Sequence, residues 1–236
     1  FAASRPAIDY VVVGEPTSMR LVSSHKGGRV YRVHVGGHSA HSSLKPHAVN
    51  AIEIAARLVV FISEMAGREA SWGARDEGFD VPFSTISCNM IEGGNGPNIV
   101  PDRCSFLHEM RVLPGVDPAR LAETIEAYAR DVLIPSSRTA NGLEATIRFD
   151  LLGDIPALAE DAGSTIHAVA ARLSGTTAGK VAFGTEAGFF QRHGTPTIVI
   201  GPGSIEQAHK PDEFVTLDQL AACDRFLDRL LALDLA

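Results

Sequence analysis

Two kinds of apolar pattern recur along the chain. Residues 9–14 form a short β-branched run that ends in glycine, which is typical of a strand buried on both faces of an α/β sheet. Residues 28–36 instead alternate polar with apolar positions, as expected for a sheet with one face in water. The sequence therefore predicts an α/β portion and a second portion built on a half-exposed sheet.

The half-exposed portion follows the order β-α-β-β-α-β. Apolar residues at helical spacing predict one helix over 50–65 and another that begins at Pro118. Strand-like runs complete the order at 28–36, 83–91, 104–113 and 143–151. This is the order of a ferredoxin-like sandwich, which we expect at residues 25–152.

The segments on either side of the sandwich return to the buried-sheet pattern. The predicted elements are a helix over 159–174, a strand over 195–201 and a closing helix over 217–233. We therefore expect an α/β fold class, in which residues 1–24 and 153–236 form part of one α/β domain and the sandwich is inserted between them.

Composition limits the classes of function. The net charge of −7, without a basic run, argues against a binder of nucleic acids or of anionic membranes. The longest apolar runs fall far short of the ~20 residues needed to cross a bilayer. Three cysteines without C-x-x-C spacing indicate neither a disulfide framework nor a thiolate zinc site, so we expect the cytoplasm. The chain begins without an initiator Met, and we expect a piece of a longer protein.

Two candidate metal ligands follow predicted buried strands. Glu15 comes directly after the strand at 9–14, and Pro16 holds its backbone extended. His209 lies in the Gly/Pro-rich loop after the strand at 195–201. Ligands gather at the carboxyl ends of strands in open α/β sheets, and carboxylate with imidazole suits zinc. From the residues alone, Glu15 could equally be a helix cap or solvated acid, and His209 a surface histidine.

Three polar clusters mark candidate catalytic or substrate-binding loops. His41 lies in the turn G-G-H-S-A-H-S-S after the first strand of the sandwich, where a plain helix-capping loop is the alternative. Asn98 and Arg111 could together hold a carboxylate or a developing oxyanion, or serve as hairpin and strand-face residues. Gly184 and Thr185 resemble a strand-to-helix turn whose threonine caps the helix or binds substrate.

Taken together and in this order, six segments resemble the M20 family of metallopeptidases and deacylases, and within it the acetylornithine deacetylases. The resemblance covers essentially the whole chain. The segments are G-E-P-T-S, H-K-G, G-H-S-A-H-S-S, N-I-V-P-D, G-T-E-A and G-P-G-S-x-x-Q-A-H-K-P-D-E.

The resemblance implies zinc-dependent hydrolysis of an N-acyl amino acid. It favours N-acetylornithine, split to ornithine and acetate in arginine biosynthesis. Glu15 matches the terminal carboxylate ligand of one zinc and His209 the histidine ligand of the other, with cobalt as the alternative metal. The alternative substrates are succinyl-diaminopimelate and other substrates of M20 aminoacylases and carboxypeptidases.

The same resemblance implies a homodimer formed through the inserted domain. His41 matches the histidine that reaches into the partner's active site and polarises the scissile amide. Asn98 and Arg111 resemble the pair that holds the substrate carboxylate or the tetrahedral oxyanion. Gly184 and Thr185 match a substrate-contacting loop.

One departure from the family pattern concerns the metal site. The family's H-x-D motif, its bridging aspartate and its Glu-Glu pair, which supplies the general base, have no match here. We therefore expect the C-terminal portion of a deacylase, inactive by itself. The alternative outside enzymes is a module for dimerisation and binding only.

Overall fold

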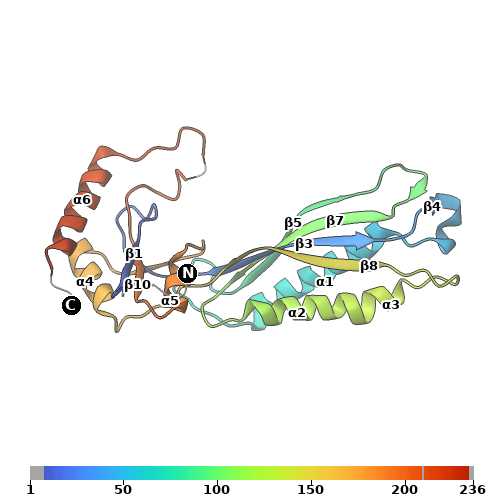
Figure 1. Cartoon of the computed structure of the whole chain (residues 1–236), viewed down its shortest axis with the longest axis horizontal. Helices are drawn as coiled ribbons and strands as arrows, with labels where there is room; N and C mark the ends of the chain where they lie inside the picture. Colours follow the sequence, from blue (N-terminus) through green and yellow to red (C-terminus); the bar gives the residue numbers. More distant parts are fainter. Residues whose placement is uncertain (1–7, 209, 234–236) are drawn as a thin grey trace. The chain divides into compact units, whose positions relative to one another are not determined.

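The computed structural model describes residues 8–208 and 210–233, which fall into two compact units (Figure 1). Unit 2 comprises Gly28–Asp76 and Phe83–Asp154, and unit 1 comprises the rest. Residues 77–82 belong to unit 1 although both flanking segments belong to unit 2. The buried ring of Phe79 explains this placement, since it packs against two lysines of unit 1. Within the described residues, no helix combines the length and apolarity needed to cross a bilayer.

Unit 2 is a ferredoxin-like sandwich. Its main elements are β3 (Gly27–Gly36), α1 (Ala51–Trp72), β5 (Thr85–Gly93), β7 (Arg103–Val112), α2 (Pro118–Tyr128) and β8 (Thr146–Ile155). After α2 the helical path continues through a π-turn (Ala129–Leu133) into α3 (Ile134–Ser136). The strands lie in the order β5-β7-β3-β8. The predicted β-α-β-β-α-β order is therefore present.

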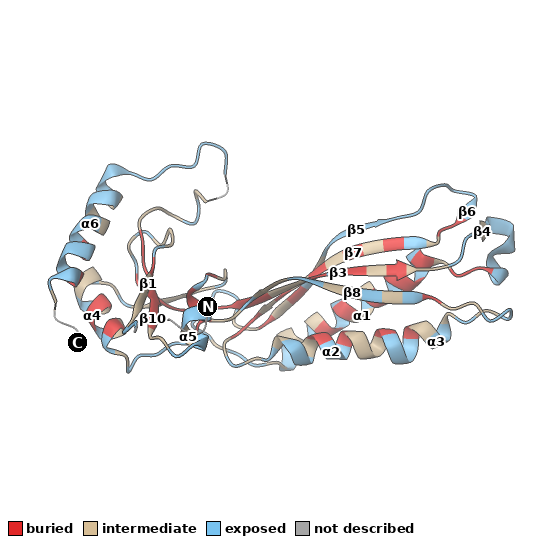
Figure 2. Cartoon of the chain, in the orientation of Figure 1, coloured by how far each residue is buried: buried red, intermediate tan, exposed pale blue. Residues whose placement is uncertain are grey.

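The helices cover one face of this sheet. Alternate residues of β3 and β7, such as Val33 and Phe106, are buried against Leu58, Ile62 and the rest of the helical layer. Figure 2 shows these buried positions on the central strands and on the helices. The intervening strand positions are polar or partly exposed, so the opposite face of the sheet is open. The alternation of polar and apolar residues in the sequence thus indicates a sheet that is packed against a core on one face only.

The first helix runs further than predicted. Asn50 caps α1, its side-chain oxygen accepting from the backbone N–H of Ile52 at 3.0 Å and of Glu53 at 3.2 Å. The sequence predicts an end near residue 65, but α1 continues to Trp72. A Cβ added at Gly67 would meet nothing within 4 Å, so this glycine lies in open space and the helix passes through it.

Unit 1 contains a four-stranded sheet in the order β1-β10-β2-β9. Its elements are β1 (Val11–Val13), β2 (Val22–His25), α4 (Thr165–Ser174), β9 (Gly179–Val181), α5 (Ala187–Arg192), β10 (Thr197–Val199) and α6 (Leu217–Leu231). β1 and β10 are parallel, with Val12 opposite Ile198. β2 is antiparallel to β10 and parallel to β9. Two predicted buried strands therefore lie side by side.

Two features of unit 1 differ from the sequence prediction. The helix predicted over 159–174 begins only at Thr165, because Leu158 forms a bridge with His25 and Ser164 caps the helix through a 3.4 Å bond to His167. Strands β2 and β9 are absent from the prediction. β2 reads V-S-S-H, and its buried polar residues hide the strand pattern.

Candidate functional site

Two predicted site residues meet at one end of unit 2. The short strands β4 (Ala40–His41) and β6 (Ile99–Val100) form an antiparallel pair in which His41 lies opposite Ile99. The backbone N–H of Ser42 donates to the carbonyl oxygen of Asn98 at 3.0 Å. The pairing therefore places the backbone of His41, the candidate catalytic residue, beside that of Asn98, the candidate substrate-binding residue.

The side chain of His41 is exposed and anchored through one ring nitrogen. Nδ1 lies 2.8 Å from the hydroxyl of Ser43 and accepts from the backbone N–H of the same residue at 3.3 Å. This contact caps the 3₁₀ helix η1 (Ser42–His47). His41 thus caps η1 through Nδ1 and still exposes its imidazole ring to solvent. A capping role of this loop and a catalytic role of His41 are therefore compatible.

Arg111 lies at the opposite end of β7 from this pair. It faces Thr85 on β5 and forms an ion pair with Glu109. Gly28 leaves room for the guanidinium, because an added Cβ would lie 3.3 Å from Nη1 of Arg111. β7 begins at Arg103, close to Asn98 in sequence, and a strand rises roughly 3.4 Å per residue, so Arg111 lies about 27 Å further along. Asn98 and Arg111 therefore do not meet within one chain.

The candidate metal ligand Glu15 lies just beyond the carboxyl end of β1. It is partly buried, and Gly201 follows β10 at the same edge of the sheet. An added Cβ at Gly201 would lie 2.5 Å from the carbonyl oxygen of Glu15, so only glycine permits this close approach. The second candidate ligand, His209, lies outside the described residues.

A hollow of about 370 Å³ opens beside this edge of the sheet in unit 1. The residues that follow Glu15 line one side of it, and charged side chains of both signs line the rest. The lining includes Thr17, Arg20, Asp80, Lys180, Ser204 and Glu206. Its mixed polarity suits a small polar molecule with more than one charged group.

The predicted turn at Gly184 and Thr185 lies between β9 and α5. Thr185 is buried, and its hydroxyl accepts from the backbone N–H of Ala187 at 3.1 Å. The hydroxyl is therefore engaged in shaping the start of α5. Gly184 is only partly buried, so the backbone of the turn is the part open to a ligand.

His25 and Lys26 belong to the segment H-K-G of the family resemblance, which implies no role for either of them. Both side chains are almost fully buried, at 0% and 1% exposure, and burial lowers the pKa of each. Nδ1 of His25 lies 2.9 Å from the carbonyl oxygen of Lys26, while the charge of Glu186 partly offsets the lowered pKa of the imidazole. The ammonium of Lys26 lies 5.8 Å from the centre of the Phe79 ring. The sequence feature that marks them is a set of polar residues inside the strand-like run V-S-S-H-K.

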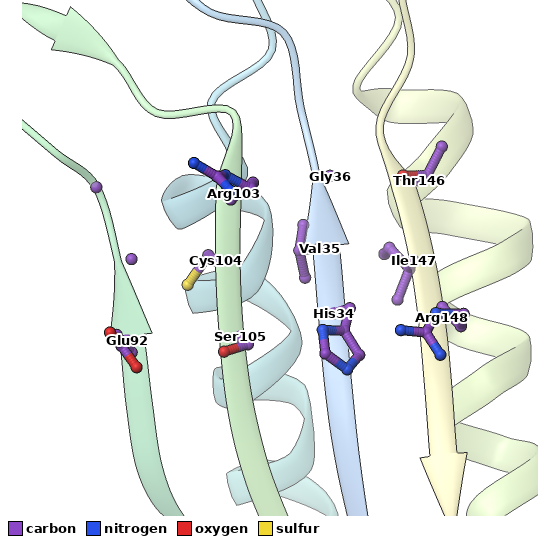
Figure 3. A pocket seen from close by; sticks show the side chains of 12 residues that line it. His34, Val35, Gly36, Glu92, Arg103, Cys104, Ser105, Thr146, Ile147 and Arg148 are labelled. Carbon is purple, nitrogen blue, oxygen red and sulfur yellow. The ribbon is translucent and has the colours of Figure 1, made fainter.

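The open face of the unit 2 sheet carries a second hollow, of about 730 Å³ (Figure 3). Side chains from four strands line it, including Glu92, Ser105, His34 and Arg148. Nε2 of His34 pairs with Asp150 at 3.1 Å. The lining includes the acid Glu92 and the bases Arg103 and Arg148, and none of the predicted site residues within the described part of the chain belongs to it.

A zinc site in a protein takes three or four side-chain ligands. A carboxylate such as that of Glu15 suits zinc as one ligand. Among residues 8–208 and 210–233, no three His, Cys, Asp or Glu side chains form a group that could hold a metal ion. To hold zinc, the carboxylate of Glu15 would therefore need further ligands from outside the described residues.

Comparisons with known proteins agree on one family. Residues 23–136 match the peptidase dimerisation domain of the M20 type. The chain is 32% identical over 223 residues to an acetylornithine deacetylase of Aliivibrio salmonicida, and 31% identical over 229 residues to one of Myxococcus xanthus. Each alignment covers 94% of this chain and 57% of the relative, so the chain spans little more than half the length of these curated relatives.

Solved structures show the same fold. A tripeptidase of Staphylococcus aureus matches with a TM-score of 0.66 and 20% identity, over 94% of this chain and 56% of that one. Human carnosine dipeptidase 1 matches with a TM-score of 0.61 and 13% identity, over 93% and 58%. The fold of the chain is thus found in enzymes that act on peptides.

Proposed function

The chain belongs to the M20 family, and from this premise we propose that it is part of an enzyme that hydrolyses the amide bond of an N-acyl amino acid. The proposed substrate is N-acetylornithine, which would yield ornithine and acetate for arginine biosynthesis in the cytoplasm. The acetylornithine deacetylases that match over 94% of the chain support this choice.

The observation that carries the proposal is the distribution of polar groups over unit 2. His41 and Asn98 lie at one end of the sheet, and Arg111 lies at the other. One small substrate cannot span the roughly 27 Å along β7. A second copy in two-fold arrangement brings opposite ends of two sheets together, so the proposed site takes groups from both subunits.

The edge strand β5 is the proposed dimer surface. β5 ends the sheet order, so among the described residues no strand pairs with its other side. Met90 and Ile91 on this strand are 66% and 59% exposed, and Val60 of the adjoining helix α1 is 57% exposed. An open edge with exposed apolar side chains favours pairing with another strand. Two copies of β5 and α1 would cover these surfaces.

In the proposed mechanism, Glu15 and His209 would each hold one zinc ion, or cobalt in its place. Bound zinc supplies Lewis acidity to the scissile carbonyl. His41 donates a hydrogen bond to the oxyanion that develops in the partner's site. Its exposed ring at the tip of unit 2 suits this role.

Substrate binding falls to Arg111, Asn98 and the turn at Gly184 and Thr185. The guanidinium of Arg111 can bind the α-carboxylate of the substrate through two parallel bonds. Asn98 adds an amide donor from the subunit that does not supply Arg111. The backbone at Gly184 contacts the substrate, and the hydroxyl of Thr185 stabilises the turn.

The chain is proposed not to hydrolyse amides by itself. Its 236 residues contain neither an H-x-D motif nor a Glu-Glu pair, which in this family supply metal ligands and the general base. The proposed test therefore compares this chain with one in which a segment carrying those motifs precedes it.

Hydrolysis of N-acetylornithine, N-succinyl-diaminopimelate and N-acetylmethionine would be measured for both proteins. We expect the extended protein to prefer N-acetylornithine and this chain to be inactive. Replacing His41 by Ala in the extended protein should lower kcat by about 100-fold or more, since it removes an oxyanion donor. Lack of hydrolysis of every N-acyl amino acid by the extended, zinc-loaded protein would refute the proposal.

A further inference from the structure

The hydrogen bonds around His41 define which ring nitrogen carries the proton. The backbone N–H of Ser43 points at Nδ1 from 3.3 Å, and a backbone N–H can only donate. Nδ1 must therefore offer its lone pair. The hydroxyl of Ser43, 2.8 Å from the same nitrogen, can then only donate as well. In the neutral imidazole the proton lies on Nε2.

We propose that Ser43 is a positioning residue, which holds His41 in the tautomer that donates from Nε2. The catalytic meaning of this inference rests on the proposed function. An oxyanion needs a donor, and the other tautomer would turn the lone pair of Nε2 toward it. Ser43 thus determines whether the exposed edge of the ring attracts or repels an anionic oxygen.

The backbone on both sides of His41 in the sequence holds the residue in this position. On one side, β4 fixes His41 opposite Ile99. On the other side, His41 has the extended conformation of a helix cap, with φ −61° and ψ 141°, directly before η1. With Nδ1 engaged in capping, the exposed ring has only Nε2 left for an incoming group. The ligand class it fits is an anionic or carbonyl oxygen.

The neighbouring serine provides a matched control. Ser42 is also exposed, and its side chain takes no part in the two bonds to Nδ1. Ser43→Ala removes the hydroxyl and keeps the backbone donor, Ser43→Thr keeps both donors, and Ser42→Ala keeps the whole arrangement. The three variants therefore separate the hydroxyl of Ser43 from general effects on the loop.

The test is long-range proton–nitrogen NMR of this chain at pH 8. The signals of His41 are assigned by their loss in His41→Asn. We expect Nε2 to carry the proton in the native chain. In Ser43→Ala the ratio of the two tautomers should shift toward Nδ1–H by about threefold to tenfold, the range of one neutral hydrogen bond. Ser43→Thr and Ser42→Ala should match the native chain.

A native His41 protonated on Nδ1, or an unchanged tautomer ratio in Ser43→Ala, would overturn the inference. The measurement uses no substrate or metal, so a failure of the proposed hydrolysis leaves its outcome unaffected. In an extended, active protein, Ser43→Ala should lower kcat by about threefold to tenfold and leave KM unchanged. A change in KM alone would also contradict a role in orienting the oxyanion donor.

Discussion

His41 lies opposite Ile99 in the antiparallel pair of β4 and β6, which brings its backbone beside that of Asn98. The pair lies at the end of unit 2 where β7 begins, while Arg111 lies near the end of that strand. Residues proposed to bind one substrate are thus separated along a single rigid sheet. Dimerisation is therefore a requirement of the proposed site.

A charge on the β5 edge should separate the subunits. Met90→Lys puts an ammonium on the exposed edge strand, where burying it between two subunits would be costly. We expect light scattering after size exclusion to show a dimer for the native chain and a monomer for this variant. Leu152→Lys on β8, at the other edge of the sheet and 52% exposed, is the control and should remain dimeric. The opposite result would assign the interface to β8.

The core of unit 2 should depend on α1. Leu58 is fully buried between the helix and the sheet, so Leu58→Ala should lower the free energy of unfolding by about 2–5 kcal/mol. Arg120→Ala, at an exposed position of α2 outside the proposed dimer surface, should change it by less than about 0.5 kcal/mol. Urea unfolding followed by circular dichroism measures both. Equal effects of the two substitutions would contradict the packing described for α1.

Acid should destabilise unit 2 through His108. This ring is buried and stacked on Tyr31 with centroids 5.1 Å apart, and burial lowers its pKa to about 4 from an ordinary 6.5. The unfolded chain therefore binds the proton more readily between these values. Stability is complete above pH 6.5 and declines as the pH falls toward 4, by about 2 kcal/mol between pH 7.5 and pH 5.

The matched variant for this effect is His108→Phe, which keeps a ring for stacking but cannot titrate. Its unfolding free energy, measured in urea at both pH values, should fall by about 2 kcal/mol less than that of the native chain. His25, whose pKa burial also lowers, is present in both proteins and cancels in the comparison. Identical pH dependence in the two proteins would show that His108 does not titrate as its burial indicates.

Zinc binding by this chain should be weak. After dialysis against micromolar zinc, we expect a content near zero per chain, because the proposed ligands Glu15 and His209 would be only two of those that a dinuclear site needs. Atomic absorption measures the content, and Glu15→Gln is the control for adventitious binding. A value of about two zinc ions per chain that falls in Glu15→Gln would contradict the proposed inactivity of the chain.

Much of the fold follows from local patterns in the sequence. Alternation along β3 predicts the one-sided sheet, and the run before Gly14 predicts β1. The apolar pattern predicts an end of α1 near residue 65, whereas the helix passes through Gly67, whose surroundings are open, and ends at Trp72. β2 is missed because its serines and His25 are buried in a strand without an apolar pattern.

The candidate site was harder to predict than the fold. Asn98 and Arg111 are near in sequence, which suggests a shared ligand, but the extended strand between them carries them apart. His41 and Asn98 are distant in sequence, and only the pairing of β4 with β6 brings them together. Such placement depends on long-range pairing, which no local pattern encodes.

The most direct test of a site shared between subunits is complementation between two inactive variants of the extended protein. Glu15→Gln would damage the proposed metal site of its own subunit, whereas His41→Ala would remove the donor that is proposed to act in the partner's site. A mixed dimer then has one intact site, so unfolding and refolding an equal mixture should restore about a quarter of native acetylornithine hydrolysis. If the mixture stays as inactive as each variant alone, His41 does not act in the partner's site.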